Sequence, residues 1–133
     1  MNDANDEQLL AAARGARVRA HAPYSGVRVG AAVLDDTGAI HVGCNVENAA
    51  YPQGSCAEAN AIGAMIAGGG RRIRAISVVG GTDAPGPCTP CGGCRQRIAE
   101  FADGETRVLF LDDDGRPASY TIAELLPLSF NLG

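Results

Sequence analysis

The sequence contains no lysine, and its 11 basic residues, all arginine, are outnumbered by 15 acidic residues, which gives a net charge of -4. A protein that follows the backbone of a nucleic acid needs a basic footprint, so we expect no nucleic-acid partner. No apolar run approaches the roughly 18 residues of a membrane helix. The acidic stretch 1–7 lacks the basic and apolar regions of a signal peptide. We therefore expect a cytoplasmic protein without a membrane partner.

The chain also lacks internal repeats, low-complexity tracts and linkers. Its 133 residues are within the size of one ordinary domain, and 46% of them are hydrophobic and 20% charged, as in globular proteins. A chain of this length buries roughly two thirds of its unfolded surface and builds a core without disulfide bonds. We predict a single domain over residues 1–133.

The cysteines are odd in number, which argues against a disulfide framework and favours a reducing compartment. They are Cys44, Cys56, Cys88, Cys91 and Cys94. Clustered cysteines in such a compartment indicate metal or redox chemistry.

Hydrophobic periodicity predicts helices and strands in alternation. We expect a helix over residues 5–20 capped by Asn5, strands over 29–34 and 39–46 joined by the turn 35–38, a helix over 56–67, a strand over 73–79, a helix from about Cys91, a strand over 107–111, and a last short helix opened by the capping box Thr121–Glu124. This order indicates an α/β fold with one central, partly parallel sheet and helices on both faces.

The strongest chemical signal is the motif Pro90-Cys91-Gly92-Gly93-Cys94, which puts two thiols on one face at a helix start. Backbone N–H groups and the helix dipole favour thiolates there. On its own the pair fits zinc, redox or iron–sulfur roles. An iron–sulfur role is disfavoured, because Ile98 stands where a ferredoxin run that includes Cys88 has its fourth cysteine. A thioredoxin-like role is disfavoured because the pair follows the third strand and not the first.

A second helix start, Cys56-Ala57-Glu58, lies one βα unit before Cys91, so both starts can meet at one end of the sheet. Three thiolates with an open position are the ligands of a catalytic zinc, whereas a structural zinc needs a fourth ligand, from Cys44 or Cys88. Glu58 favours the catalytic site, because a carboxylate on an otherwise apolar helix suits a general acid/base beside a metal. The alternative for Glu58 is an acid that only complements the helix dipole.

This combination is the signature of the zinc-dependent deaminases, and the sequence resembles the small homotetrameric cytidine deaminases nearly end to end. The resemblance is carried by Pro23-Tyr24-Ser25, Val29-Gly30-Ala31-Ala32, Gly43-Cys44-Asn45-Val46-Glu47-Asn48-Ala49, Tyr51-Pro52, Cys56-Ala57-Glu58, Ala61-Ile62, Pro90-Cys91-Gly92-Gly93-Cys94-Arg95-Gln96 and Leu125-Leu126-Pro127. It implies a three-layer α-β-α fold with a central mixed five-stranded sheet. The implied activity is the zinc-dependent hydrolytic deamination of cytidine and 2′-deoxycytidine to uridine and 2′-deoxyuridine, in pyrimidine salvage.

The resemblance also implies roles for single residues. Cys56, Cys91 and Cys94 would ligate one zinc ion per chain. Glu58 would move a proton from the zinc-activated water to N3 of the pyrimidine and then to the leaving amine.

For the substrate, the resemblance implies that Asn45 and Glu47 bind the ribose 3′-hydroxyl. Their spacing of two at a strand end agrees, since it points both side chains to one face. The backbone N–H of Ala57 would bind the pyrimidine O2, and the carbonyl of Thr89 the leaving amino group.

Tyr51 and Phe130 would come from neighbouring subunits of a homotetramer to close the pocket. The sequence departs from the family at Val27, where a phenylalanine usually stacks on the pyrimidine, and at Ala59, where an arginine often donates to the zinc thiolates. Arg95 is the nearest substitute donor in the motif. Two alternatives stay open: a deaminase of another aminopyrimidine nucleoside such as blasticidin S, and a non-catalytic zinc-binding domain.

Overall fold

The computed structural model describes residues 4–133. Its helices and strands follow one another in the order α1 (Ala4–Arg17), β1 (Arg28–Asp35), β2 (Ile40–Cys44), the short 3-10 helix η1 (Tyr51–Gln53), α2 (Ala57–Ala67), β3 (Ile73–Gly81), α3 (Gly92–Phe101), β4 (Arg107–Leu111), β5 (Pro117–Thr121) and α4 (Ile122–Leu125).

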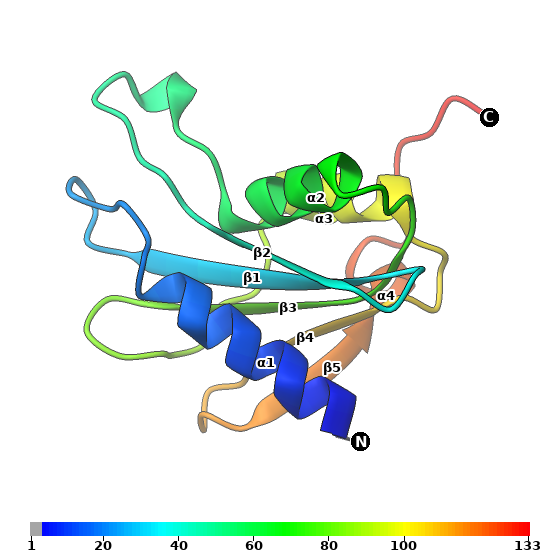
Figure 1. The fold of residues 1–133 in the computed structure, drawn as a ribbon, viewed down its shortest axis with the longest axis horizontal. Helices are drawn as coiled ribbons and strands as arrows, with labels where there is room; N and C mark the ends of the chain where they lie inside the picture. The colour runs from blue at the N-terminus through cyan, green and yellow to red at the C-terminus, as the bar shows by residue number, and fades with distance from the viewer. Residues whose placement is uncertain (1–3) are drawn as a thin grey trace.

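The strands form one mixed sheet in the order β2-β1-β3-β4-β5, in which β3 and β4 are parallel and all other neighbours antiparallel (Figure 1). The register pairs Gly30 with Cys44 across β1 and β2, and Ala75 with Arg107 across β3 and β4. A parallel pair needs a crossover connection, and the segment that contains α3 supplies it between β3 and β4. The predicted α/β fold with a mixed five-stranded sheet is confirmed.

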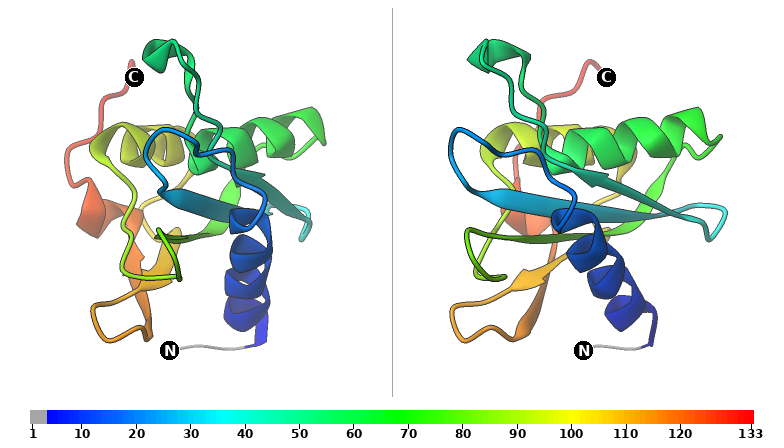
Figure 2. Two further views of the ribbon diagram at one scale, coloured as in Figure 1. Left: turned by 90° about the vertical axis from the view of Figure 1, so that its left-hand side faces the viewer. Right: turned by 60° about the vertical axis from the view of Figure 1, so that its left-hand side comes forward.

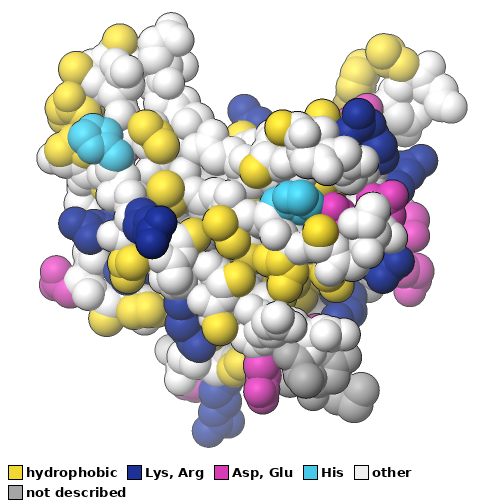
Figure 3. Space-filling view, in the orientation of Figure 1, with side chains coloured by type: hydrophobic (Ala, Val, Ile, Leu, Met, Phe, Trp, Pro, Cys, Tyr) yellow, Lys and Arg dark blue, Asp and Glu magenta, His cyan; other side chains and the backbone are white. Residues whose placement is uncertain are grey.

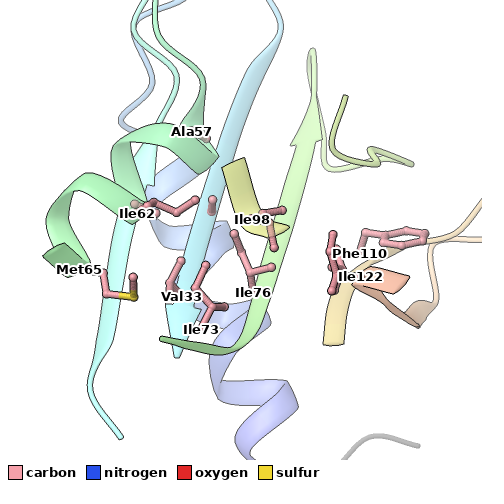
Figure 4. Close-up of a cluster of buried hydrophobic side chains, with 12 residues drawn as sticks. Val33, Ala57, Ile62, Met65, Ile73, Ile76, Ile98, Phe110 and Ile122 are labelled. Atoms are coloured by element: carbon pink, nitrogen blue, oxygen red, sulfur yellow. The ribbon is translucent and has the colours of Figure 1, made fainter. Parts of the chain in front are cut away.

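Helix α1 covers one face of this sheet, and α2 and α3 cover the other (Figure 2). The alternation of side chains along β1 divides them between the two faces: Ala31 and Val33 join the core beneath α2 and α3, whereas Ala32 faces α1. Met65 of α2 and Ile98 of α3 are fully buried in the first of these cores (Figure 4). The helices are therefore fixed on the sheet by apolar burial on both sides.

Helix α2 approaches β2 closely enough for the two backbones to touch. A Cβ atom built on Gly43 of β2 would lie 2.7 Å from the carbonyl oxygen of Ala57 and closer still to the amide nitrogen of Ala61. Ordinary contacts of a Cβ begin at 3.4 Å, so a glycine is required here. This contact fixes the first turn of α2 relative to the sheet.

Several details of the secondary structure differ from the sequence-based expectation, and the first is that α1 ends at Arg17 and not at residue 20. Helix α1 has already begun at Ala4, so Asn5 lies inside the helix and is not its cap. Periodicity located four strands and missed β5, whose residues Pro117, Ala118 and Ser119 have weak β propensity and lie on the sheet edge. The predicted capping box is confirmed, with reciprocal hydrogen bonds between Thr121 and Glu124.

Two segments project from the α2 and α3 side of the molecule: residues 45–55, which include η1, and the C-terminal segment that follows α4 (Figures 1 and 3). Both carry large exposed hydrophobic side chains, with Tyr51 74% and Phe130 69% exposed. Within residues 4–133, no helix combines the length and apolar character needed to span a bilayer.

Candidate active site

A pocket of about 350 Å³ opens at the first turns of α2 and α3. Most of the residues predicted for the site line it, namely Asn45, Glu47, Cys56, Ala57, Glu58, Thr89, Cys91 and Cys94. The β3–α3 loop adds Cys88, and β1 adds Val29. The fold therefore brings together two motifs that are separated in sequence by a helix, a strand and a loop.

Two of the three predicted zinc ligands are the residues that precede the helices. Cys56 is the N-cap of α2 and Cys91 the N-cap of α3, and neither side chain makes a capping hydrogen bond. The backbone N–H groups of Cys94 and Gly93 and the Cys94 thiol lower the pKa of Cys91 below its ordinary value. The start of α3 thus favours the thiolate that a metal needs.

Cys94, in the first turn of α3, is 1% exposed and lines the same pocket as Cys56 and Cys91. Burial, and then the negative charges of Glu58 and Cys56, raise the pKa of Cys94. Three sulfur donors that line one pocket, at the positive ends of two helices, fit zinc by their chemistry.

Within residues 4–133, no three Cys, His, Asp or Glu side chains are already placed as a finished metal site. The assignment of Cys56, Cys91 and Cys94 as ligands therefore stays a prediction.

Glu58 projects from the first turn of α2 and is 5% exposed. Burial raises the pKa of this carboxyl. Its own backbone N–H, the Cys94 thiol and the charge of Arg97 oppose that shift without cancelling it. A raised pKa makes this buried carboxyl a better proton acceptor than an ordinary glutamate, which suits a general acid/base beside a cluster of sulfurs.

Asn45 and Glu47 follow β2 directly, and both hold the segment that leads into β1. The Asn45 amide accepts a hydrogen bond from Val29 N (2.8 Å) and donates one to Val27 O (2.9 Å). Glu47 accepts from Tyr24 N (2.9 Å), and from both N–H and hydroxyl of Ser25. These bonds lower the pKa of Glu47, with the Ser25 hydroxyl as the largest cause. The contact of Asn45 and Glu47 with a ribose hydroxyl stays a prediction. The two side chains would make it in addition to their hydrogen bonds to residues 24–29.

Three of the predicted substrate contacts are not among the residues that line the pocket: Val27, Tyr51 and Phe130. Val27 immediately precedes β1 and is 40% exposed. Tyr51 lies in the projecting segment and packs edge to face on Tyr24, with the ring centres 5.9 Å apart. Phe130 lies in the C-terminal segment.

Tyr51 lines a neighbouring hollow of about 350 Å³ with Tyr24, Ser25 and Glu47. Ser25 is a residue that sequence reasoning gave no role. Its place in the stretch Pro23-Tyr24-Ser25, which resembles the family, is the feature that could have indicated a role. The hollow and the main pocket share Glu47.

The guanidinium donor nearest the thiols is not the expected one. Arg95 donates from Nε to Pro90 O (2.8 Å) and from Nη1 to Leu125 O (3.0 Å), so its hydrogen bonds hold the backbone and not a sulfur. Arg97, which sequence reasoning missed, places Nη1 3.7 Å from Cys94 Sγ. The helical spacing of three between Cys94 and Arg97 is the signal that could have found it, because residues three apart share a helix face.

Comparison with known proteins identifies the family. Residues 3–111 match the model of the cytidine and deoxycytidylate deaminase zinc-binding region. The chain belongs to this family. It is 43% identical to a cytidine deaminase of Sporosarcina psychrophila over 125 residues, which cover 94% of this chain and 90% of the relative. It is 38% identical to a cytidine deaminase of Mycobacterium tuberculosis over 132 residues, with 99% and 94% covered.

Solved structures agree with this membership. The crystal structure of cytidine deaminase from Burkholderia pseudomallei superposes with a TM-score of 0.84 at 40% identity, covering 93% of this chain and 98% of that one. The cytidine deaminase from Mycobacterium tuberculosis superposes with a TM-score of 0.83 at 37% identity, covering 98% and 100%. The likeness thus extends over the whole catalytic fold.

Proposed function

We propose that this chain is a zinc-dependent enzyme that hydrolyses the amino group of cytidine and 2′-deoxycytidine, so that water and the nucleoside give uridine or 2′-deoxyuridine and ammonia. The observation that carries the proposal is the buried Glu58 carboxyl, which lines one pocket with the three predicted zinc ligands in a chain of the deaminase family. A purely structural zinc site has no use for such a carboxyl.

Zinc held by Cys56, Cys91 and Cys94 would supply Lewis-acid activation of a water molecule at neutral pH. Glu58 supplies the proton transfers. It takes a proton from the attacking water, gives one to N3 of the pyrimidine, and later protonates the leaving amine. Its raised pKa, which results from burial, suits a group that must be deprotonated in one step and protonated in the next.

Backbone groups in the pocket orient the base. The N–H of Ala57 is in the first turn of α2, where helix N–H groups have no partner within the helix, and it donates to the pyrimidine O2. The carbonyl of Thr89 accepts from the amino group that leaves. Asn45 and Glu47 bind the ribose 3′-hydroxyl, for which Glu47 has a lowered pKa and so remains an ionised acceptor.

We further propose a homotetramer in which neighbouring subunits complete each pocket. Tyr51 and Phe130 do not line the pocket of their own chain, and both are largely exposed. The two segments that contain them project from the molecule (Figure 1). Burial of such exposed hydrophobic side chains against another subunit is energetically favourable. A second chain that seats these rings would close the open side of its neighbour's pocket.

The reaction fits pyrimidine salvage, in which free nucleosides are reused. All five cysteines are free thiols. This state supports a reducing compartment such as the cytoplasm.

The test is ammonia release by the zinc-loaded protein from cytidine, 2′-deoxycytidine, cytosine, cytidine monophosphate and blasticidin S. We expect turnover of the two nucleosides and little of cytosine or the monophosphate. Turnover of blasticidin S alone would assign another aminopyrimidine substrate and give Val27 a part in that choice. No turnover of any compound by folded, zinc-loaded protein would support a non-catalytic zinc-binding domain.

The matched variant is Glu58→Gln, which keeps the shape of the side chain and removes its proton chemistry. We expect it to bind zinc at the same stoichiometry and to lose turnover by about 10²–10⁴-fold or more, since one group serves several proton transfers. Near-normal turnover by this variant would leave Glu58 with only a role at the helix end.

A further inference from the structure

Negative charge is concentrated where α2 and α3 begin. Cys56, Cys91, Cys94 and Glu58 line one pocket, and the charges of Glu58, Cys56 and Cys91 all act on Cys94. Zinc bound to three thiolates has a formal charge of -1, so the metal alone does not balance these groups. Each helix N-terminus supplies only about half a positive charge. A full cation near the sulfurs would therefore stabilise the thiolates.

Arg97 is placed to be that cation. Its Nη1 donates a hydrogen bond to Cys94 Sγ at 3.7 Å, from one helical turn further along α3. The same nitrogen would lie 3.6 Å from a Cβ atom at Gly93, so the side chain folds back along the first turn of its own helix. The charge of Arg97 also acts on Glu58. Within residues 4–133, no other arginine side chain donates a hydrogen bond to a cysteine sulfur.

Position 59 on α2, where the family often has an arginine, is an alanine in this chain, and its side chain has no donor. Arg95 is committed to the carbonyl oxygens of Pro90 and Leu125. Neither position 59 nor Arg95 therefore supplies the cation: the first has no charged side chain, and the second binds backbone carbonyl groups.

We propose that Arg97 is a positioning residue for the metal: its guanidinium holds the Cys94 sulfur through a charge-assisted N–H···S hydrogen bond and so tightens zinc binding from α3. This inference rests on the proposed zinc site. Partners that orient metal ligands typically contribute 10–100-fold to metal affinity. Arg97 is an exposed residue, so we expect the lower end of that range.

The test measures the zinc dissociation constant of the full chain by competition with a chromophoric chelator. We expect Arg97→Ala to weaken zinc binding about 10-fold and Arg97→Lys to recover much of the loss, because lysine keeps the charge. Arg14→Ala is the control, since it removes the same charge from an exposed site on α1, across the sheet. The difference between the parent and Arg97→Ala should shrink in high salt, as a partly exposed charge interaction does.

A second readout does not depend on turnover. In the cobalt(II)-substituted protein, the thiolate-to-metal charge-transfer band should move to lower energy in Arg97→Ala, because a sulfur without a donor is richer in electrons. Arg14→Ala should leave the band in place. A merely structural role for Arg97 would change the thermal stability of the metal-free protein and not this band.

Equal zinc affinity and an unchanged cobalt band in a folded Arg97→Ala protein would overturn the proposal. If Arg97→Ala does not fold, Arg97→Gln and Arg97→Lys decide it: tighter zinc binding by the lysine variant supports the proposal, and equal binding refutes it. Failure of the parent protein itself to bind zinc would instead refute the proposed function on which this inference depends.

Discussion

Replacing Gly43 by alanine tests whether the contact between β2 and α2 sets the geometry of the site. The added Cβ would lie 2.7 Å from Ala57 O and closer still to Ala61 N, where 3.4 Å is the beginning of ordinary contact. Both opposing atoms belong to the backbone of α2, so no side chain can turn away. The helix must move off the strand by roughly 1 Å, and Glu58 and Cys56 move with it.

Two effects of different size should follow. Overpacking of a well-filled contact destabilises a protein by about 1–3 kcal/mol, so the thermal midpoint of unfolding should fall. A misplacement of about 1 Å at a reacting centre reduces the rate by about 10²-fold. We therefore expect kcat/KM for ammonia release from cytidine to fall by about two orders of magnitude in protein that is still folded at the assay temperature.

Gly15→Ala is the matched control. Gly15 lies in α1, nothing lies within 4 Å of its Cβ position, and alanine is the better helix former. We expect this variant to keep its activity and to be slightly more stable. Parent-like stability and activity in Gly43→Ala would refute the reasoning. A lower midpoint with unchanged kcat/KM would show that α2 moves without disturbing the site.

Two further predictions concern the unused cysteines and a buried carboxyl. Cys44→Ala and Cys88→Ala should each retain one zinc per chain by metal analysis, because neither is a predicted ligand; loss of zinc in Cys88→Ala would make Cys88 a fourth ligand of a closed, structural site. Asp35 is 1% exposed, accepts hydrogen bonds from Thr37 and pairs with His41 at 2.7 Å, and these contacts, Thr37 first, hold the pKa of Asp35 well below its ordinary value. A lowered folded-state pKa stabilises the fold above the ordinary value near 4, and that stability is lost as the pH falls through the lowered value. Asp35→Asn should therefore unfold at lower urea concentration than the parent at pH 7, with the gap narrowing at pH 3; an equal gap at both pH values would contradict this account.

The metal motif and the helix that carries Glu58 were predictable because their signals are local. A cysteine pair at i and i+3 before a helix, and a lone carboxyl on an apolar helix, each indicate chemistry without any knowledge of the fold. Strand β5 was not predictable in this way, since Pro117, Ala118 and Ser119 acquire strand geometry only by pairing with β4. Its presence was implied only by the family resemblance.

The arginine that donates to the Cys94 sulfur shows a second limit of prediction from the sequence. Arg95 is adjacent to Cys94 in sequence and was the expected donor, yet neighbours along a helix point in different directions. Arg97, one turn away, has the contact. The bracing of residues 24–29 by Asn45 and Glu47 was equally hidden, because both bind backbone groups of a segment that precedes them by a whole hairpin.

The strand order has a consequence for when the pocket can exist. Cys56 lies between β2 and β3 along the chain, and Cys91 between β3 and β4. The hairpin β1–β2 is local, but β3 must add to the far side of β1 and β4 must then pair parallel to β3. Contacts between distant parts of a chain form slowly, because closing a long loop costs conformational entropy before the new contacts can stabilise the chain. The two helix starts therefore come together only when the middle of the sheet is complete. Recovery of zinc binding during refolding then reports the assembly of β1, β3 and β4 and not the formation of either helix.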